Sequence, residues 1–125
     1  MPVFDPQSNS STIYAYLVAN SLFTPRQLSI ISKRLQGGGK VENISSGAYY
    51  RQVKQCRKKV FSVLYSMILL QSTGIVQLEA SATLSRLAEQ LTVIFASGDR
   101  DVTSKLNVND VIYVIDEMVK RMSKL

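Results

Sequence analysis

Hydrophobic residues recur at the spacing of an amphipathic α-helix along most of the chain. This pattern predicts helices over about residues 11–21, 25–36, 46–71 and 80–96, and a last helix that follows Asn107. We therefore expect an all-α fold of about five helices, with a long central helix and C-terminal helices that serve packing or dimerisation. The first ten residues are polar and contain two prolines, so they are expected to form a flexible tail before a single helical domain at 11–125.

Residues that favour helix ends stand at the borders of these stretches. Thr24 is a good N-cap, Pro25 fits the first helical position, and Gln27 completes a capping box. The glycines at 37–39 and Gly74 should end helices, because glycine is costly inside a helix and favoured just beyond it. The other expected N-caps are Ser10 or Ser11, Ser45 or Ser46, and Asn107. Residues 40–44 and 97–101 are predicted connections, and 75–78 is predicted to be a brief strand or linker.

The long central helix has one apolar and one basic side. At about 100° per residue, a predicted buried stripe lies within about 60° of Val53 and holds Tyr49, Cys56, Val60 and Leu64. The opposite side carries Arg51, Lys54, Gln55 and Lys58, flanked by Gln52 and Lys59. Such a helix packs on one side and presents cations on the other. Tyr50 lies at the edge of the stripe, and the thiol of Cys56 is expected to be buried and unreactive.

Positive charge is concentrated in one third of the chain. Residues 24–59 hold nine basic residues and one acid, Glu42, for a net charge of +8, whereas the whole chain carries +6. A polyanion is the natural partner of such a segment. The alternative is a solvated basic surface with no specific ligand.

Residues 60–78 contain no charged side chain. Interspersed serine, glutamine, threonine and glycine make this run too polar for a membrane span, so it is interpreted as a buried helix. Its apolar residues point to more than one side, which a single small domain can hardly cover. We therefore expect a homodimer that packs through this segment, the final helices, or both. The alternative is a self-contained buried central helix.

The chain has no histidine and a single cysteine, which argues against a metal site, an intrachain disulfide and the usual catalytic pairings. Two acidic pairs, Asp116 with Glu117 on a solvated helix face and Asp99 with Asp101 in a loop, do not suggest an acid–base or metal site. No enzyme activity, cofactor, small-molecule ligand or membrane partner is therefore expected. The N-terminus lacks the features of a signal peptide, so we expect a cytoplasmic, nucleoid-associated protein.

Residues 23–31, FTPRQLSII, resemble the opening helix of LuxR-type and sigma-factor region-four helix-turn-helix domains. Residues 44–49, ISSGAY, resemble the turn and start of their recognition helix, and residues 57–60, RKKV, resemble its end. The resemblance covers residues 23–60 and implies that Gly47, Tyr50, Arg51 and Lys54 face the DNA groove while Ala48 approaches the backbone. The segment at 38–43 is about half the length of the family's positioning helix.

These observations together predict a DNA-binding protein, a dimeric transcriptional regulator that places residues 45–60 in the major groove of double-stranded DNA. Alternatives are a helical interaction module whose basic face binds an acidic protein, or a non-specific nucleoid or RNA-binding protein. Residues 23–60 are the predicted DNA-binding segment, and 61–125 form the core and dimerisation helices. The predicted DNA contacts are Arg26, Lys40, Ser45, Ser46, Gly47, Ala48, Tyr50, Arg51, Lys54, Gln55, Lys58 and Lys59.

Overall fold

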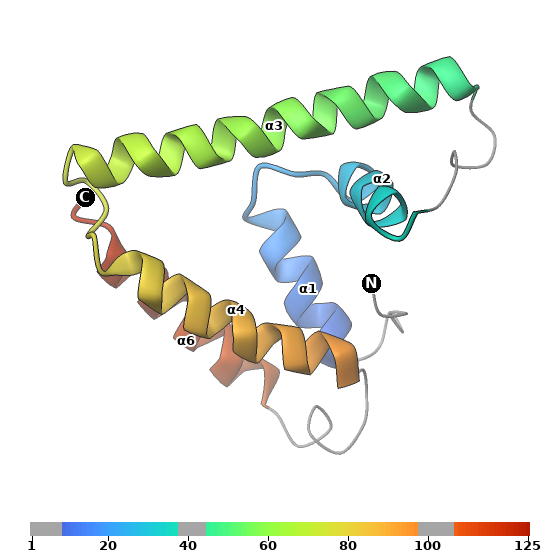
Figure 1. Ribbon diagram of the computed structural model, residues 1–125. Coiled ribbons are helices and arrows are strands. Elements are labelled where there is room, and N and C mark those ends of the chain that lie inside the picture. The colour runs from blue at the N-terminus through green and yellow to red at the C-terminus, as the bar shows by residue number, and fades with distance from the viewer. Residues whose placement is uncertain (1–8, 38–44, 98–106) are drawn as a thin grey trace.

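A computed structural model describes residues 9–37, 45–97 and 107–125. These residues form five helices: α1 (Asn9–Ala19), α2 (Pro25–Leu35), α3 (Ser46–Ser72), α4 (Ala80–Ser97) and α6 (Val108–Met122). The predicted all-α class is confirmed. The long helix α3 lies along one edge of the molecule, and the other four helices lie on the same side of it (Figure 1). No helix in the described part of the chain is long and apolar enough to cross a membrane.

Most of the predicted helix ends are confirmed by hydrogen bonds. The Thr24 hydroxyl accepts from the Gln27 amide at 3.1 Å, and the Gln27 side chain accepts from the Thr24 amide at 3.0 Å. Ser45 caps α3 by accepting from the amide of Ala48, and Asn107 caps α6. Gly37 and Gly74 follow α2 and α3 with φ of 73° and 80°, a backbone conformation that glycine adopts without a steric penalty.

The start of the first helix is corrected. It begins at Asn9, so Ser10 lies inside the helix and is 1% exposed, and neither Ser10 nor Ser11 is the N-cap. The predicted tail of residues 1–10 was therefore too long, because residues 9 and 10 belong to α1. The connection at 40–44 and the loop residues 98–101 lie outside the described residues.

Two separate apolar clusters hold the helices together. The first joins α2 to the N-terminal half of α3 through Ile30, Tyr49, Val53 and Cys56. The second joins α1, α4 and α6 and is centred on Ile13, Leu91 and Ile115. The α1–α2 connection and the C-terminal half of α3 link the two clusters (Figure 1).

Polar contacts also join segments that are distant in sequence. The Tyr16 hydroxyl donates to the Asp116 carboxylate, at 2.6 and 2.7 Å from its two oxygens, and ties α1 to α6. Asp116 is therefore half-buried and partnered rather than on a fully solvated face, which corrects the sequence interpretation. The extended segment after α3 pairs with the C-terminal end of the chain, where Val76 forms an antiparallel bridge with Ser123.

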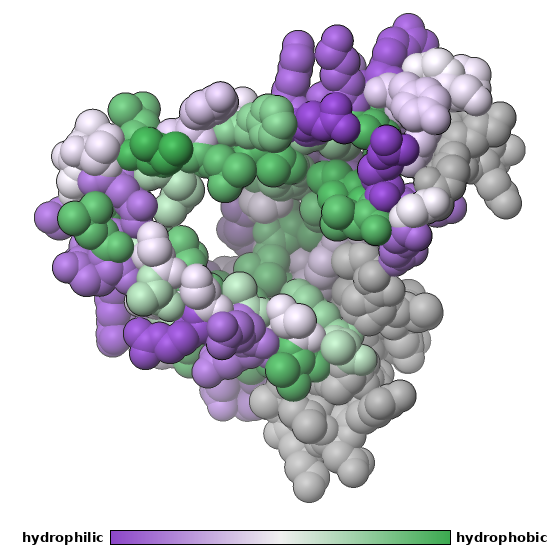
Figure 2. All heavy atoms as spheres, in the orientation of Figure 1, coloured by the Kyte–Doolittle hydropathy of each residue, from purple (hydrophilic) through white to green (hydrophobic). Residues whose placement is uncertain are grey.

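The C-terminal half of α3 is not a buried helix in this chain. Its large apolar side chains are more than half exposed: Phe61 51%, Leu64 57%, Tyr65 71%, Ile68 65% and Leu69 61%. Leu64 continues the stripe of Val53 in angle, but α2 is only eleven residues long and covers only the first part of α3. Figure 2 shows hydrophobic atoms gathered on this half of α3, beside an open gap between α3 and α4. The interpretation of a self-contained buried central helix is therefore wrong for a single copy.

Candidate nucleic-acid interface

Packing against α2 orients the basic side of α3. Tyr49, Val53 and Cys56 are each less than 9% exposed and face Ile30 of α2. The side of α3 opposite these anchors must point to solvent, because an α-helix turns by about 100° per residue. The side chains exposed there are those of Arg51, Lys54, Gln55 and Lys58. In Figure 2, hydrophilic side chains project from the N-terminal half of α3 on the side away from α2.

The charged side chains on this side of α3 are all basic. The sequence has no acidic residue between Glu42 and Glu79. The ion pair found in the described residues joins Lys120 to Glu117 on α6, at 3.7 Å, so it does not involve α2 or α3. Among the described residues, Arg51, Lys54 and Lys58 are therefore not paired with an acidic side chain, and their positive charge can attract an anionic partner.

Helix α2 adds one predicted contact to this surface. Thr24, which caps α2, and Arg26 and Gln27 of α2 line a cavity of about 210 Å³ together with Gln52 and Gln55 of α3. Arg26 is exposed, and it lies at the start of α2, beside the glutamines on the flank of the basic side. The structure thus brings Arg26 and Gln55 to one place, although they are far apart in the sequence.

Lys59 has a different environment from the other predicted contacts. Its Nζ donates to Oε1 of Gln27 at 3.2 Å and lies 5.8 Å from the centre of the Phe23 ring. The side chain is half-buried and ties α3 to the start of α2. Lys59 thereby holds the two helices in register, and its charge lies at the flank of the basic side.

The start of α3 carries four predicted contacts. Ser45 is exposed and its hydroxyl is used as the N-cap, while Ser46 and Gly47 are exposed and Ala48 is half-buried. A Cβ added at Gly47 would meet nothing within 4 Å, so nothing in the described chain crowds this end. The N-terminal end of a helix favours anions through its dipole and amide groups. Lys40, the remaining predicted contact, lies outside the described residues.

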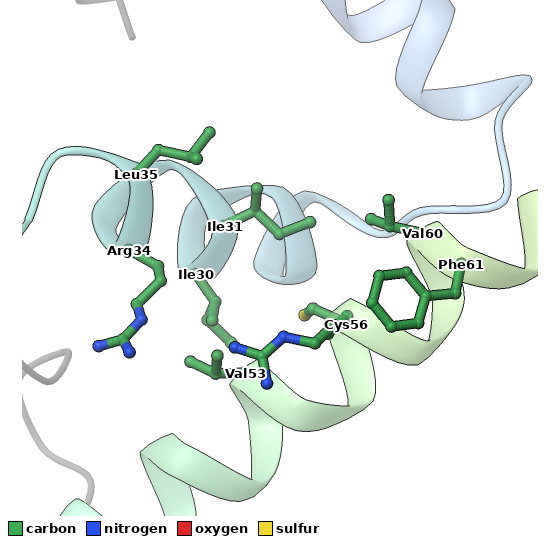
Figure 3. A pocket seen from close by; sticks show the side chains of 9 residues that line it. Ile30, Ile31, Arg34, Leu35, Val53, Cys56, Val60 and Phe61 are labelled. Atoms are coloured by element: carbon green, nitrogen blue, oxygen red, sulfur yellow. The ribbon is translucent and has the colours of Figure 1, made fainter. Parts of the chain in front are cut away.

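Two arginines that were not among the predicted contacts lie beside the interface. Arg34 of α2 and Arg57 of α3 line an apolar groove of about 390 Å³ between the two helices. Figure 3 shows Ile30, Val53 and Cys56 along this groove, with Phe61 toward one end and Arg34 toward the other. The Arg34 guanidinium lies 5.9 Å from the centre of the Tyr50 ring, and Tyr50 is 58% exposed. The charge concentration of the segment included both arginines, and Arg57 also lies in the RKKV motif, but their place beside the groove depends on how α2 docks.

The thiol of Cys56 offers no reactive site. Burial raises the pKa of this thiol, and the nearby Lys59 offsets only part of that effect. The thiol is 3.8 Å from the carbonyl oxygen of Gln27, which it faces as a weak donor. In the described residues, no group of three or more potential ligand side chains could hold a metal ion.

Comparison with protein-family models, with curated proteins and with solved structures finds no match to this chain. The function must therefore be inferred from the surface itself.

Proposed function

We propose that the protein binds double-stranded DNA through the exposed basic side of α3 and acts as a homodimeric transcriptional regulator. One observation carries the proposal: Arg51, Lys54 and Lys58 project from a single side of a rigid helix whose opposite side is anchored on α2. Lysine and arginine neutralise phosphates, and arginine also pairs with guanine edges in the major groove. The proposed role is binding rather than catalysis, in a cytoplasmic, nucleoid-associated protein.

The groups around these cations support groove binding over simple charge attraction. Gln55 shares the exposed side and can hydrogen-bond to adenine, and Tyr50 can pack on a sugar or base. The side chain that would fix α3 against α2 during binding is Lys59, through its hydrogen bond to Gln27. The helix-turn-helix resemblance agrees with this arrangement, but the shortened positioning segment at 38–43 lies outside the described residues.

The test is a titration of labelled random-sequence duplex DNA at two salt concentrations. The variant is Arg51→Ala/Lys54→Ala/Lys58→Ala, and a matched control, Arg86→Ala/Arg121→Ala/Lys124→Ala, removes three exposed cations from α4, α6 and the C-terminal end. If Arg51, Lys54 and Lys58 each neutralise one phosphate, the slope of log K against log salt should be smaller in magnitude for the variant than for the unmodified protein, by about 2.7 per copy. Over a fourfold rise in salt, the unmodified protein should therefore lose about 40-fold more DNA affinity per copy than the variant does.

The control variant should bind with nearly the salt dependence of the unmodified protein. Absence of DNA binding at low salt, or equal losses in the two variants, would refute the proposal. The first of these results would direct the search to an acidic protein partner for the same surface. Selection from a random duplex library would then separate a sequence-specific regulator from a general DNA-coating protein, since both use phosphate contacts.

A further inference from the structure

The exposed apolar side of α3 has the spacing of a helix–helix seam. Phe61, Leu64 and Ile68 follow one another at intervals of three and four residues, and Tyr65 flanks them. This is the spacing that brings one stripe of a helix against a partner helix. All four side chains are more than half exposed in the single copy. We call Phe61, Leu64 and Ile68 the α3 seam.

We infer that the α3 seam pairs with the same seam of a second copy in antiparallel orientation, which places both basic sides on one side of the dimer. A second copy fits this surface because residues 60–78 contain no charge, so two identical segments meet without like-charge contacts. The inference rests on the proposed function for the use of the basic sides, but the pairing itself does not depend on it.

Charge decides between the two orientations. The seam line continues toward the N-terminus of α3 through Arg57 and then Lys54 at the same spacing. In a parallel, in-register pair, Arg57 would face Arg57 of the second copy, and Lys54 would face its own counterpart. In an antiparallel pair centred near Leu64, Phe61 faces Ile68 of the second copy and Arg57 falls opposite the uncharged end of α3 near Ser72. Antiparallel pairing therefore avoids the repulsion between identical cations of the two α3 helices.

The groove between α2 and α3 supports the same orientation. It is apolar, is lined by Ile30, Val53, Val60 and Phe61 among others, and meets the seam at Phe61. In the antiparallel pair the C-terminal end of α3 from the second copy falls over this groove. That end is followed by Leu78, which is 72% exposed, whereas Ile75 and Val76 are half-buried and pair with the C-terminal end of their own copy. The groove thus offers apolar surface to the exposed apolar side chains at this end of the second copy.

The angle between the seam and the basic side determines how an antiparallel dimer presents its two basic sides to DNA. On α3, the mean direction of Arg51, Lys54 and Lys58 lies about 80° from the mean direction of the seam, at about 100° per residue. A two-fold axis perpendicular to the helices then keeps both basic sides facing the same way. Their centres lie about ten residues from the seam centre, or about 15 Å in each copy, so the two basic sides are about 30 Å apart. Half-sites one turn apart on B-DNA are separated by about 34 Å.

Sedimentation of the full chain without DNA tests the seam. The unmodified protein should sediment as a dimer, and Leu64→Asp should weaken the dimer at least 100-fold. The matched control is Tyr113→Asp, because Tyr113 is 65% exposed on α6, outside the α3 seam. Leu64→Asp should keep its helical circular dichroism, since Leu64 is 57% exposed within one copy. A monomeric unmodified protein, or equal weakening by the two substitutions, would overturn the inference.

Disulfide trapping tests the orientation. An equal mixture of Phe61→Cys and Ile68→Cys chains should form a cross-linked dimer, whereas each variant alone should form little. The unmodified chain is the control, since its Cys56 is 3% exposed and should not cross-link. Cross-linking of each variant with itself would show a parallel pair and overturn the orientation. No cross-linking in any sample would overturn the seam.

Duplex length separates this inference from the proposed function. The trapped dimer should bind a 20-base-pair duplex, about two turns, at least tenfold more tightly than a duplex of about 10 base pairs. A trapped antiparallel dimer that does not bind DNA at low salt would leave the pairing intact and refute the DNA-binding proposal. A dimer that binds both lengths equally would overturn the shared orientation of the basic sides.

Discussion

The buried hydroxyl of Tyr49 predicts an unusual stability change. Tyr49 is 1% exposed, at the centre of the cluster between α2 and α3, and its hydroxyl has no hydrogen-bond partner among the described residues. A buried polar group without a partner costs about 1–3 kcal/mol, because it loses its hydrogen bonds to water. Replacement of Tyr49 by Phe removes that hydroxyl and keeps the ring.

We therefore expect Tyr49→Phe to raise the free energy of unfolding by about 1 kcal/mol or more. For a chain of this size the corresponding rise in Tm is about 3–5 °C. Tyr49→Ala, which removes the ring as well, should instead lower the free energy of unfolding by about 3–5 kcal/mol. The contrast separates the contribution of the ring from that of the hydroxyl.

Urea unfolding followed by circular dichroism measures these changes, and Tyr50→Phe is the matched control. Tyr50 is the next residue on the same helix and is 58% exposed, so loss of its hydroxyl should change stability by less than about 0.5 kcal/mol. Destabilisation by Tyr49→Phe of about 1 kcal/mol would refute the reasoning, because it would mean that the hydroxyl is hydrogen-bonded in the folded protein.

Three further predictions test other parts of the fold. Thr24→Ala removes one half of the capping box and should lower the free energy of unfolding by about 1 kcal/mol in urea; no change would mean that the cap is not formed in solution. Ile13→Ala should cost about 2–5 kcal/mol because Ile13 is 0% exposed, whereas Leu22→Ala should change stability by less than about 0.5 kcal/mol; similar effects of the two would contradict the second cluster. The hydrogen bond to Asp116 raises the pKa of Tyr16, with smaller effects of burial and of the carboxylate charge. The protonated Tyr16 hydroxyl therefore stabilises the folded protein at lower pH, and this stabilisation is lost as pH rises through the raised pKa. The free energy of unfolding should therefore fall less steeply with alkaline pH in Tyr16→Phe than in the unmodified protein, and equal slopes would count against the bond.

Apart from the start of α1, the helices and the ends named here follow from local chemistry, which is why they could be predicted from the sequence. Thr24 with Gln27, Ser45 and Asn107 satisfy amides within their own first turns, and Gly37 and Gly74 adopt the conformation that ends a helix. The division of α3 into a packed and a basic side also follows from helix geometry alone. These features involve residues only a few positions apart, so no tertiary contact is needed to specify them.

The extent of each buried surface was decided by how the helices dock. Val53 and Leu64 lie on the same stripe of α3, yet α2 covers the first and leaves the second exposed. Asp116 looks solvated on its own helix and becomes a hydrogen-bond acceptor only when α1 brings Tyr16 to α6, one hundred residues away in sequence. Lys59 likewise turns toward Gln27 once α2 is in place. Helical periodicity specifies the direction of a side chain, whereas its burial and partners depend on contacts between segments that are distant in sequence.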